Sequence, residues 1–166
     1  KLFSYLELCF KKEIKRMLKD GVRLIASGDI SYLPKKTRDT VIEAIDRTKD
    51  CSNLVCNICL NYGGNYEIVR AAKQFAIDVK NGRDVDSLTI DNFSDYLYTK
   101  DMPPVDLLIR TSGECRTSNF LPYQLIYAEM LFPTVTWPDF TKDEFRKCLD
   151  EYYNRDRRFG GIYEKE

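Results

Sequence analysis

Short, unbroken apolar runs alternate with stretches of helical periodicity along this 166-residue chain. The runs at residues 22–27, 54–60 and 105–109 do not alternate apolar with polar side chains, so both faces of each expected strand are predicted to be covered. Strands that alternate with helices favour parallel pairing, because a parallel pair needs a long connection. The predicted fold class is therefore α/β, with a largely parallel sheet covered by helices.

Glycine and proline mark the expected ends of the helices. Gly21 follows a helical pattern at residues 2–20, Pro34 is placed to open a second helix, and Gly82 is placed to end a third. The remaining expected elements are a short helix at 91–98, a helix at 120–128, a strand or extended segment at 131–136 and a closing helix at 143–154. No internal repeat or linker interrupts residues 1–166, which we predict to form one domain.

The charge balance excludes a strong field over the whole protein. Lysine plus arginine and aspartate plus glutamate both number 26, so we expect no nucleic-acid partner, and any anion site must be local. The chain contains no histidine, which excludes histidine-based catalysis by these residues. No run reaches the roughly 18 apolar residues of a membrane-spanning helix, and no secretion signal is readable, although a preceding segment would hide one.

Cys51, Cys56 and Cys59 are spaced like candidate zinc ligands. The last two fall in an expected strand, where residues three apart point to opposite faces, so they cannot close on one ion without breaking that strand. Small core residues are the favoured interpretation, and six cysteines in a chain rich in ordinary core residues indicate free thiols in a reducing compartment.

Two polar stretches follow expected strands, NYGG at 61–64 and RTSGECR at 110–116. In parallel sheets, ligands bind beyond the carboxyl ends of the strands. Arg110 and Arg116 offer planar forks of donors that suit phosphate oxygens, Ser118 adds a hydroxyl, and a helix beginning near Asn119 would point free N–H groups at the same anion. A diphosphate is the predicted ligand, and an ordinary polar surface loop is the alternative.

Glu129 lies within the otherwise apolar run LIYAEMLF. It either ends a helix in water or faces a metal or hydroxyl in a site. Because burying an unpaired carboxylate costs several kcal/mol, we expect a partner for it.

The segment PPVDLLIRTSGECRTSNFLPYQLIYAEMLFPTVTWPDF, with NYGG before it and NRDRRFGG near the end, resembles the cis-prenyltransferases. This family includes undecaprenyl diphosphate and dehydrodolichyl diphosphate synthases, and the similarity runs from the first helix to Gly161. The resemblance implies an undecaprenyl diphosphate synthase-like fold. It also implies repeated addition of isopentenyl diphosphate to an allylic diphosphate such as farnesyl diphosphate, with Mg²⁺ assisting.

The resemblance also implies roles for individual residues. Catalysis is expected to involve Glu129, Arg110 and Arg116, with Glu129 tied to Mg²⁺, and Leu24 matches a position on the wall of the product tunnel. The implied substrate-binding residues are Arg110, Arg116, Ser118, Asn61, Gly63, Arg158, Gly160 and Gly161. The last three belong to a terminal arm that reaches the active site across a homodimer.

The product implied by the resemblance is a cis-polyprenyl diphosphate for dolichol or undecaprenol-type lipid carriers. A homodimer is the expected assembly, and a hetero-subunit is the alternative. We expect a cytoplasmic protein with peripheral membrane contact for product release, at the endoplasmic reticulum in a eukaryote.

One departure from the family concerns its amino-terminal segment. The Asp-Gly-Asn-x-Arg motif, whose aspartate holds Mg²⁺ in the family, is absent from these 166 residues. The sequence is therefore interpreted as part of a longer enzyme, as a chain completed by another chain, or as a non-catalytic partner subunit or diphosphate-binding adaptor. The intact Arg-Thr-Ser-Gly-Glu-x-Arg pattern favours the first, with the 166 residues inactive by themselves.

Overall fold

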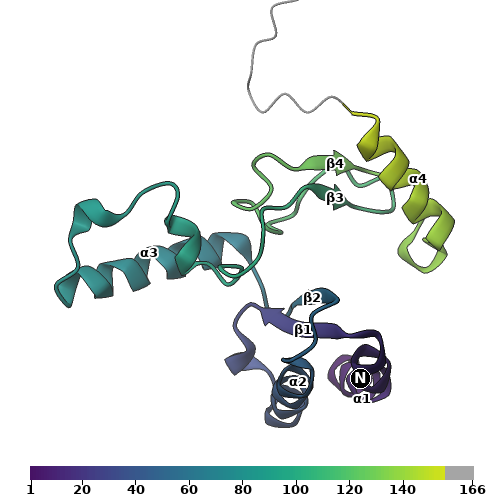
Figure 1. The fold of residues 1–166 in the computed structure, drawn as a ribbon, viewed down its shortest axis with the longest axis horizontal. Helices are drawn as coiled ribbons and strands as arrows, with labels where there is room; N and C mark the ends of the chain where they lie inside the picture. The colour runs from purple at the N-terminus through teal and green to yellow at the C-terminus, as the bar shows by residue number, and fades with distance from the viewer. Residues whose placement is uncertain (156–166) are drawn as a thin grey trace, which may run out of the picture. The chain divides into compact units, whose positions relative to one another are not determined.

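The computed structural model describes residues 1–155 and divides the chain into two compact units. Unit 1 is Lys1–Lys100, and unit 2 begins at Asp101 (Figure 1). Each unit contains its own pair of parallel strands. No helix among the described residues combines the length and the apolar character needed to cross a membrane.

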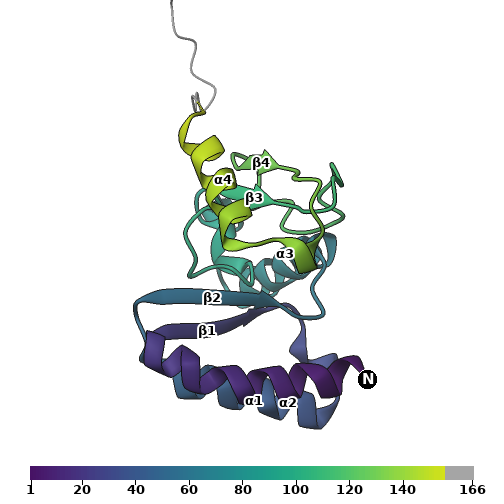
Figure 2. The same cartoon turned by 90° about the vertical axis from the view of Figure 1, so that its right-hand side faces the viewer.

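Unit 1 is built around one parallel strand pair. Its regular elements are α1 (Leu2–Asp20), β1 (Val22–Ser27), α2 (Lys35–Thr48), β2 (Leu54–Cys59) and α3 (Gly64–Lys80). Apart from the short helix expected at 91–98, the predicted helices and strands of this region are confirmed, with Gly21 in the left-handed conformation after α1 and Pro34 directly before α2. The register of β1 and β2 runs from Val22 opposite Leu54 to Ser27 opposite Cys59, and α1 and α2 lie side by side against this pair (Figure 2).

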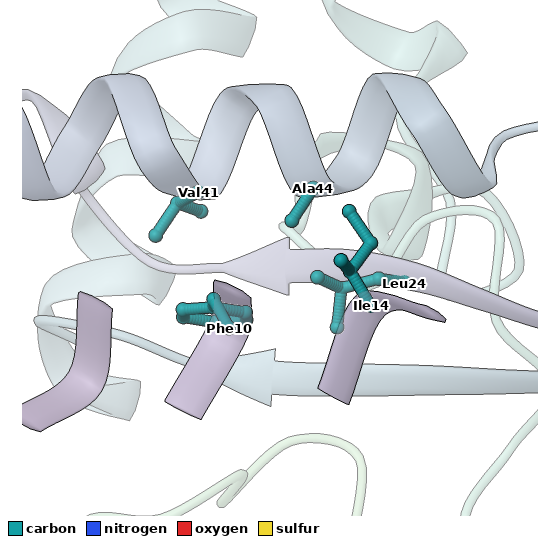
Figure 3. Close-up of a cluster of buried hydrophobic side chains, with 5 residues drawn as sticks. All are labelled: Phe10, Ile14, Leu24, Val41 and Ala44. Carbon is teal, nitrogen blue, oxygen red and sulfur yellow. The ribbon is translucent and has the colours of Figure 1, made fainter. Parts of the chain in front are cut away.

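The core of unit 1 lies between these two helices and β1. Leu24 projects from the strand between α1 and α2 and is only 1% exposed (Figure 3). The buried cluster is Phe10, Ile14, Leu24, Val41 and Ala44. Burying one such leucine fully contributes about 1.5–3 kcal/mol, so this cluster is a main source of the stability of unit 1.

Leu24 also fixes β1 to α2 through its backbone. Its N–H donates to Thr48 Oγ1 at 3.0 Å, and the Thr48 hydroxyl donates in turn to the Ala44 carbonyl at 2.9 Å. Thr48 is fully buried. The threonine therefore satisfies a strand N–H that would otherwise be buried without a partner.

The short helix expected at 91–98 is only a 3₁₀ turn, Phe93–Tyr96. The side chains of Thr89 and Asn92, just before this turn, accept hydrogen bonds from backbone N–H groups. Asn92 Oδ1 accepts from the Thr89 N–H at 2.9 Å, and Thr89 Oγ1 accepts from the Asn92 N–H at 3.3 Å. Such local side-chain bonds favour turns over regular helix.

Unit 2 contains β3 (Leu107–Ile109), β4 (Glu129–Leu131) and α4 (Lys142–Tyr153). Leu107 lies opposite Glu129 and Ile109 opposite Leu131 in a parallel pair. The predicted third strand and closing helix are confirmed with shorter or shifted bounds, and Thr141 caps α4 by accepting from the Glu144 N–H at 3.3 Å. The strand predicted at 131–136 is wrong in its bounds, because β4 is Glu129–Leu131 and Pro133 has no N–H to continue a ladder.

The helix expected at 120–128 is wrong. This segment consists of turns, and Ser118, Asn119 and Leu121 have positive φ angles of 49°, 65° and 47°. The backbone of Leu121 is also restricted because Pro122 follows it, and a residue before proline avoids the helical region. The helix N-terminus that we expected near Asn119 is therefore absent from the predicted anion site.

We expect Leu24→Ala to lower the free energy of unfolding by about 2–5 kcal/mol, because it leaves a cavity between α1 and α2. Chemical denaturation measures the change. Leu8→Ala is the matched control, since Leu8 is 61% exposed, and it should change stability by less than about 0.5 kcal/mol. Equal losses in the two variants would contradict the packing described here.

Candidate functional site

The loop after β3 is held against the segment after β4 by backbone hydrogen bonds. The Arg110 N–H donates to the Leu131 carbonyl at 2.9 Å, that of Ser112 to Val135 at 2.8 Å and that of Gly113 to Pro133 at 2.9 Å. Ser112 and Gly113 both have left-handed backbones, with φ angles of 69° and 66°. Gly113 adopts this conformation without steric cost, so the chain can turn back immediately after the strand.

The guanidinium of Arg110 closes this loop on itself. Its Nη1 donates to Ser118 Oγ at 2.9 Å and also to the backbone carbonyl of Arg116. The side chains of Arg110 and Ser118, both predicted to bind the anion, are thus in direct contact. The third predicted residue, Arg116, is bonded to Arg110 through its backbone carbonyl. All three belong to the connection between β3 and β4.

The side chain of Arg116 forms an ion pair with Glu114. The arginine side chain is 64% exposed and the glutamate 40%. Exposed pairs of this kind contribute at most about 1 kcal/mol. A phosphate group could therefore replace the Glu114 carboxylate at little cost, and it would bring two negative charges to Arg110 and Arg116.

Glu129 is the first residue of β4, not the end of a helix. Its Oε2 accepts from Arg155 Nη1 at 2.9 Å, and the two side chains are 26% and 34% exposed. The expected partner of this carboxylate is therefore Arg155, and bonds to Glu129 and Glu151 raise the pKa of its guanidinium. Because Glu129 lies opposite Leu107, three positions before Arg110, it is about 10 Å along the strand direction from the arginine loop.

The NYGG stretch lines an open hollow in unit 1. The hollow has a volume of about 390 Å³ and lies where β1 and β2 end, the position predicted for this stretch. Asn61 and Gly63 contribute to it, and the complete lining is Asp29, Tyr32, Asn61, Tyr62, Gly63 and Tyr66. Asn61 joins the two strand ends, since its Nδ2 donates to the Asp29 carbonyl at 2.9 Å and its own carbonyl accepts from the Asp29 N–H at 3.3 Å.

Asp29 is a lining residue that the sequence analysis did not identify. Its Oδ1 accepts from the hydroxyl and the N–H of Ser31, at 2.5 Å and 3.1 Å, and its Oδ2 accepts from the Tyr66 hydroxyl at 3.3 Å. The pKa of Asp29 lies below its ordinary value, mainly because the Ser31 hydroxyl donates a hydrogen bond to it. The Ser31 N–H and the Tyr66 hydroxyl lower this pKa further. Its position two residues after the first strand, at the same edge as NYGG, was the available signal.

Glu67 was also missed, and it supports the NYGG loop from inside the unit. This carboxylate is fully buried on α3. Its Oε2 accepts from the Tyr62 hydroxyl at 2.6 Å, and its Oε1 accepts from the Tyr98 N–H at 2.7 Å. Arg70 lies over the Tyr98 ring, 4.0 Å from its centroid. Glu67 therefore connects the loop after β2 to the chain around Tyr98.

Other predicted residues have separate locations. Leu24 belongs to the buried core of unit 1, and its role as a tunnel residue stays a prediction. Cys56 packs against that core. Burial, and to a lesser extent the nearby Glu67 carboxylate, raises the pKa of the Cys59 thiol to about 11. Arg158, Gly160 and Gly161 lie outside the described residues.

We expect Tyr62→Phe to lower the free energy of unfolding by about 1–3 kcal/mol, because it removes a donor from a buried carboxylate. Thermal or chemical denaturation near neutral pH measures this change. Tyr5→Phe removes the same hydroxyl from a side chain that is 68% exposed, so it should have almost no effect. A Tyr62→Phe variant as stable as Tyr5→Phe would mean that the Tyr62–Glu67 bond contributes nothing.

Comparison with known proteins matches this chain to one protein family. The family described as "Putative undecaprenyl diphosphate synthase" matches residues 1–160. An isoprenyl transferase from Clostridium perfringens is 46% identical over 153 residues, covering 92% of this chain and 60% of the relative. One from Streptococcus agalactiae serotype V is 45% identical over 158 residues, covering 92% and 63%. The chain thus spans about 60% of the length of these curated relatives.

Two solved structures share the fold. Lavandulyl diphosphate synthase from Lavandula x intermedia, in complex with dimethylallyl diphosphate, matches with a TM-score of 0.91 and 30% identity, covering 96% of this chain and 70% of that one. A probable undecaprenyl diphosphate synthase from Campylobacter jejuni matches with a TM-score of 0.81 and 34% identity, covering 95% and 72%. These matches confirm the predicted α/β fold class.

Proposed function

This chain belongs to the undecaprenyl diphosphate synthase family, and we propose that it carries the isopentenyl diphosphate-binding part of a cis-prenyltransferase. The proposed enzyme joins isopentenyl diphosphate to an allylic diphosphate, such as farnesyl diphosphate, and makes each new double bond cis. The observation that carries the proposal is the bonding of Arg110 to Ser118 and to the backbone of Arg116 within one exposed loop.

The chemistry of this loop suits a diphosphate better than a single carboxylate. Arg110 and Arg116 each present a planar fork of donors, and a diphosphate has enough oxygens to engage both forks and the Ser118 hydroxyl. The net charge of the chain is zero, so attraction of the substrate depends on these local groups. In the proposed reaction the loop binds the isopentenyl substrate by its diphosphate and orients its double bond.

The reaction needs no nucleophilic side chain. A carbon–carbon bond forms between the alkene of isopentenyl diphosphate and the allylic carbon, while the allylic carbon–oxygen bond breaks and diphosphate departs. Loss of a proton from the condensed product then creates the new double bond. Binding and fixed donors near the departing charge are the main requirements, which agrees with a chain that contains no histidine.

Mg²⁺ is the proposed cofactor, and Glu129 is the residue proposed to help hold it. Mg²⁺ is usually bound by one or two carboxylates together with substrate phosphates. Glu129 fits this role because it is a partly exposed carboxylate whose bond to Arg155 uses only Oε2. When bound, the cation would neutralise charge on the diphosphate that departs. A further aspartate ligand is proposed to lie in an Asp-Gly-Asn-x-Arg segment, which these 166 residues do not include.

The finer assignments rest on family membership. The two curated isoprenyl transferases named above are bacterial, which supports an undecaprenol-type carrier rather than dolichol as the product's destination. A homodimer, substrate contacts from Asn61, Gly63, Arg158, Gly160 and Gly161, a tunnel contact from Leu24 and peripheral membrane contact for product release are also proposed. They stay predictions.

In the protein translated from the complete reading frame, we expect replacement of Arg110 and Arg116 by glutamine to weaken isopentenyl diphosphate binding at least tenfold for each arginine. The reason is that hydrogen bonds to charged groups contribute about 1.5–3 kcal/mol each. Isothermal titration and condensation of radiolabelled substrate measure the two effects. A control with Arg16→Gln and Arg146→Gln removes the same charge from side chains that are 75% and 73% exposed. Unchanged binding and synthesis in the Arg110/Arg116 double variant would contradict the proposal.

The 166 residues by themselves are expected to bind isopentenyl diphosphate weakly and to make no product. The physical reason is that half of the proposed metal ligation is missing from them. Incubation with radiolabelled isopentenyl diphosphate, farnesyl diphosphate and Mg²⁺ tests this directly, and labelled polyprenyl product from this polypeptide alone would refute it. A non-catalytic partner or adaptor would differ in another way, since its complete reading frame would also give no product.

A further inference from the structure

Arg155, two residues after the end of α4, makes three contacts. Its Nη1 donates to Glu129 Oε2 at 2.9 Å and to the Met130 carbonyl at 3.3 Å, and its Nη2 donates to Glu151 Oε1 at 2.6 Å. Glu151 lies one helical turn earlier on α4. The guanidinium is thus fixed between α4 and the first two residues of β4.

These contacts fix the orientation of the Glu129 carboxylate. The same nitrogen binds a carboxylate oxygen of Glu129 and the backbone of the next residue, so the side chain is tied to the strand that carries it. Within residues 1–155, the hydrogen bonds and ion pairs described for Glu129 engage Oε2 and not Oε1. A carboxylate held at one oxygen can accept a ligand at the other with little loss of side-chain freedom.

The charges of this group favour a cation. Arg155 contributes one positive charge, and Glu129 and Glu151 contribute two negative charges, so the three side chains together carry −1. Glu151 also forms an ion pair with the guanidinium. The guanidinium therefore repels a second cation near Glu129 less strongly.

We propose that Arg155 is a positioning residue that orients Glu129 toward a divalent cation. The inference rests on the proposed function, in which Glu129 helps to hold Mg²⁺. Loss of a partner that orients a metal ligand typically weakens metal binding or activity about 10- to 100-fold. The alternative is that Arg155 occupies the place of the cation and competes with it.

The test uses the protein from the complete reading frame and Mn²⁺ as the probe. Electron paramagnetic resonance of free Mn²⁺ gives the dissociation constant, and a Mg²⁺ titration of the condensation rate gives an independent measure. The variants are Arg155→Gln, Arg155→Lys and Glu129→Gln. Arg146→Gln is the matched control, because Arg146 is also an arginine associated with α4 and pairs with exposed Asp143.

We expect Arg155→Gln to raise the Mn²⁺ dissociation constant and the Mg²⁺ requirement about 10-fold or more, close to the effect of Glu129→Gln. Arg155→Lys should recover part of the loss, because it keeps one charged donor for Oε2. The isopentenyl diphosphate dissociation constant measured without metal should stay unchanged. General unfolding would weaken the binding of both metal and isopentenyl diphosphate, so this result would distinguish the two explanations.

Three results would count against this. If Glu129→Gln weakens Mn²⁺ binding and Arg155→Gln does not, the positioning role is overturned while the proposed function stands. Tighter Mn²⁺ binding by Arg155→Gln would show competition instead of positioning. If the wild-type protein neither binds Mn²⁺ nor condenses the substrates, the proposed function fails and this inference fails with it.

Discussion

Parallel strand pairing is the constraint on which both units depend. Two parallel strands cannot be joined by a tight turn, so each pair requires a long connection. In unit 1 the connection contains α2, which packs against β1 and completes the core with Val41 and Ala44. In unit 2 the connection between Ile109 and Glu129 contains no regular helix and carries Arg110, Arg116 and Ser118. The same topological requirement thus produces a packing element in one unit and a polar loop in the other.

A polar connection without a helix needs other restraints. The loop after β3 obtains them from backbone bonds to residues 131–135 and from the Arg110 guanidinium, which reaches across the loop to Ser118. Ser112 and Ser118 are held with left-handed backbones, a conformation that costs a residue other than glycine on the order of 1 kcal/mol. Such a cost persists only where the surroundings fix the backbone, and it is common at ligand-binding sites. The loop is therefore partly arranged before any anion binds.

The sequence predicted elements that carry their own apolar pattern and stop signals. α1, β1 and α2 matched the expected positions because Gly21, Pro34 and the buried stripes are local signals. The helix predicted at 120–128 was wrong because its apolar run fits a helical pattern. Pro122 and the residues with left-handed backbones before it prevent a helix there. At the site, residue chemistry identified the arginine loop. It could not identify the bonds from Arg155 to Glu129 or from Tyr98 to Glu67, which join residues 26 and 31 positions apart.

Glu67 and Glu129 illustrate how surroundings separate two glutamates that look alike in sequence. Glu67 is fully buried, and neutral donors from Tyr62 and Tyr98 bind both of its oxygens. Both oxygens are already engaged and shielded from solvent, so its effect is to hold the NYGG loop in place. Glu129 is 26% exposed and bonded to a charged arginine through one oxygen. A carboxylate in the second environment keeps one oxygen for a cation. The number of oxygens already bound, together with exposure, therefore separates a carboxylate that supports a loop from one that can take part in chemistry.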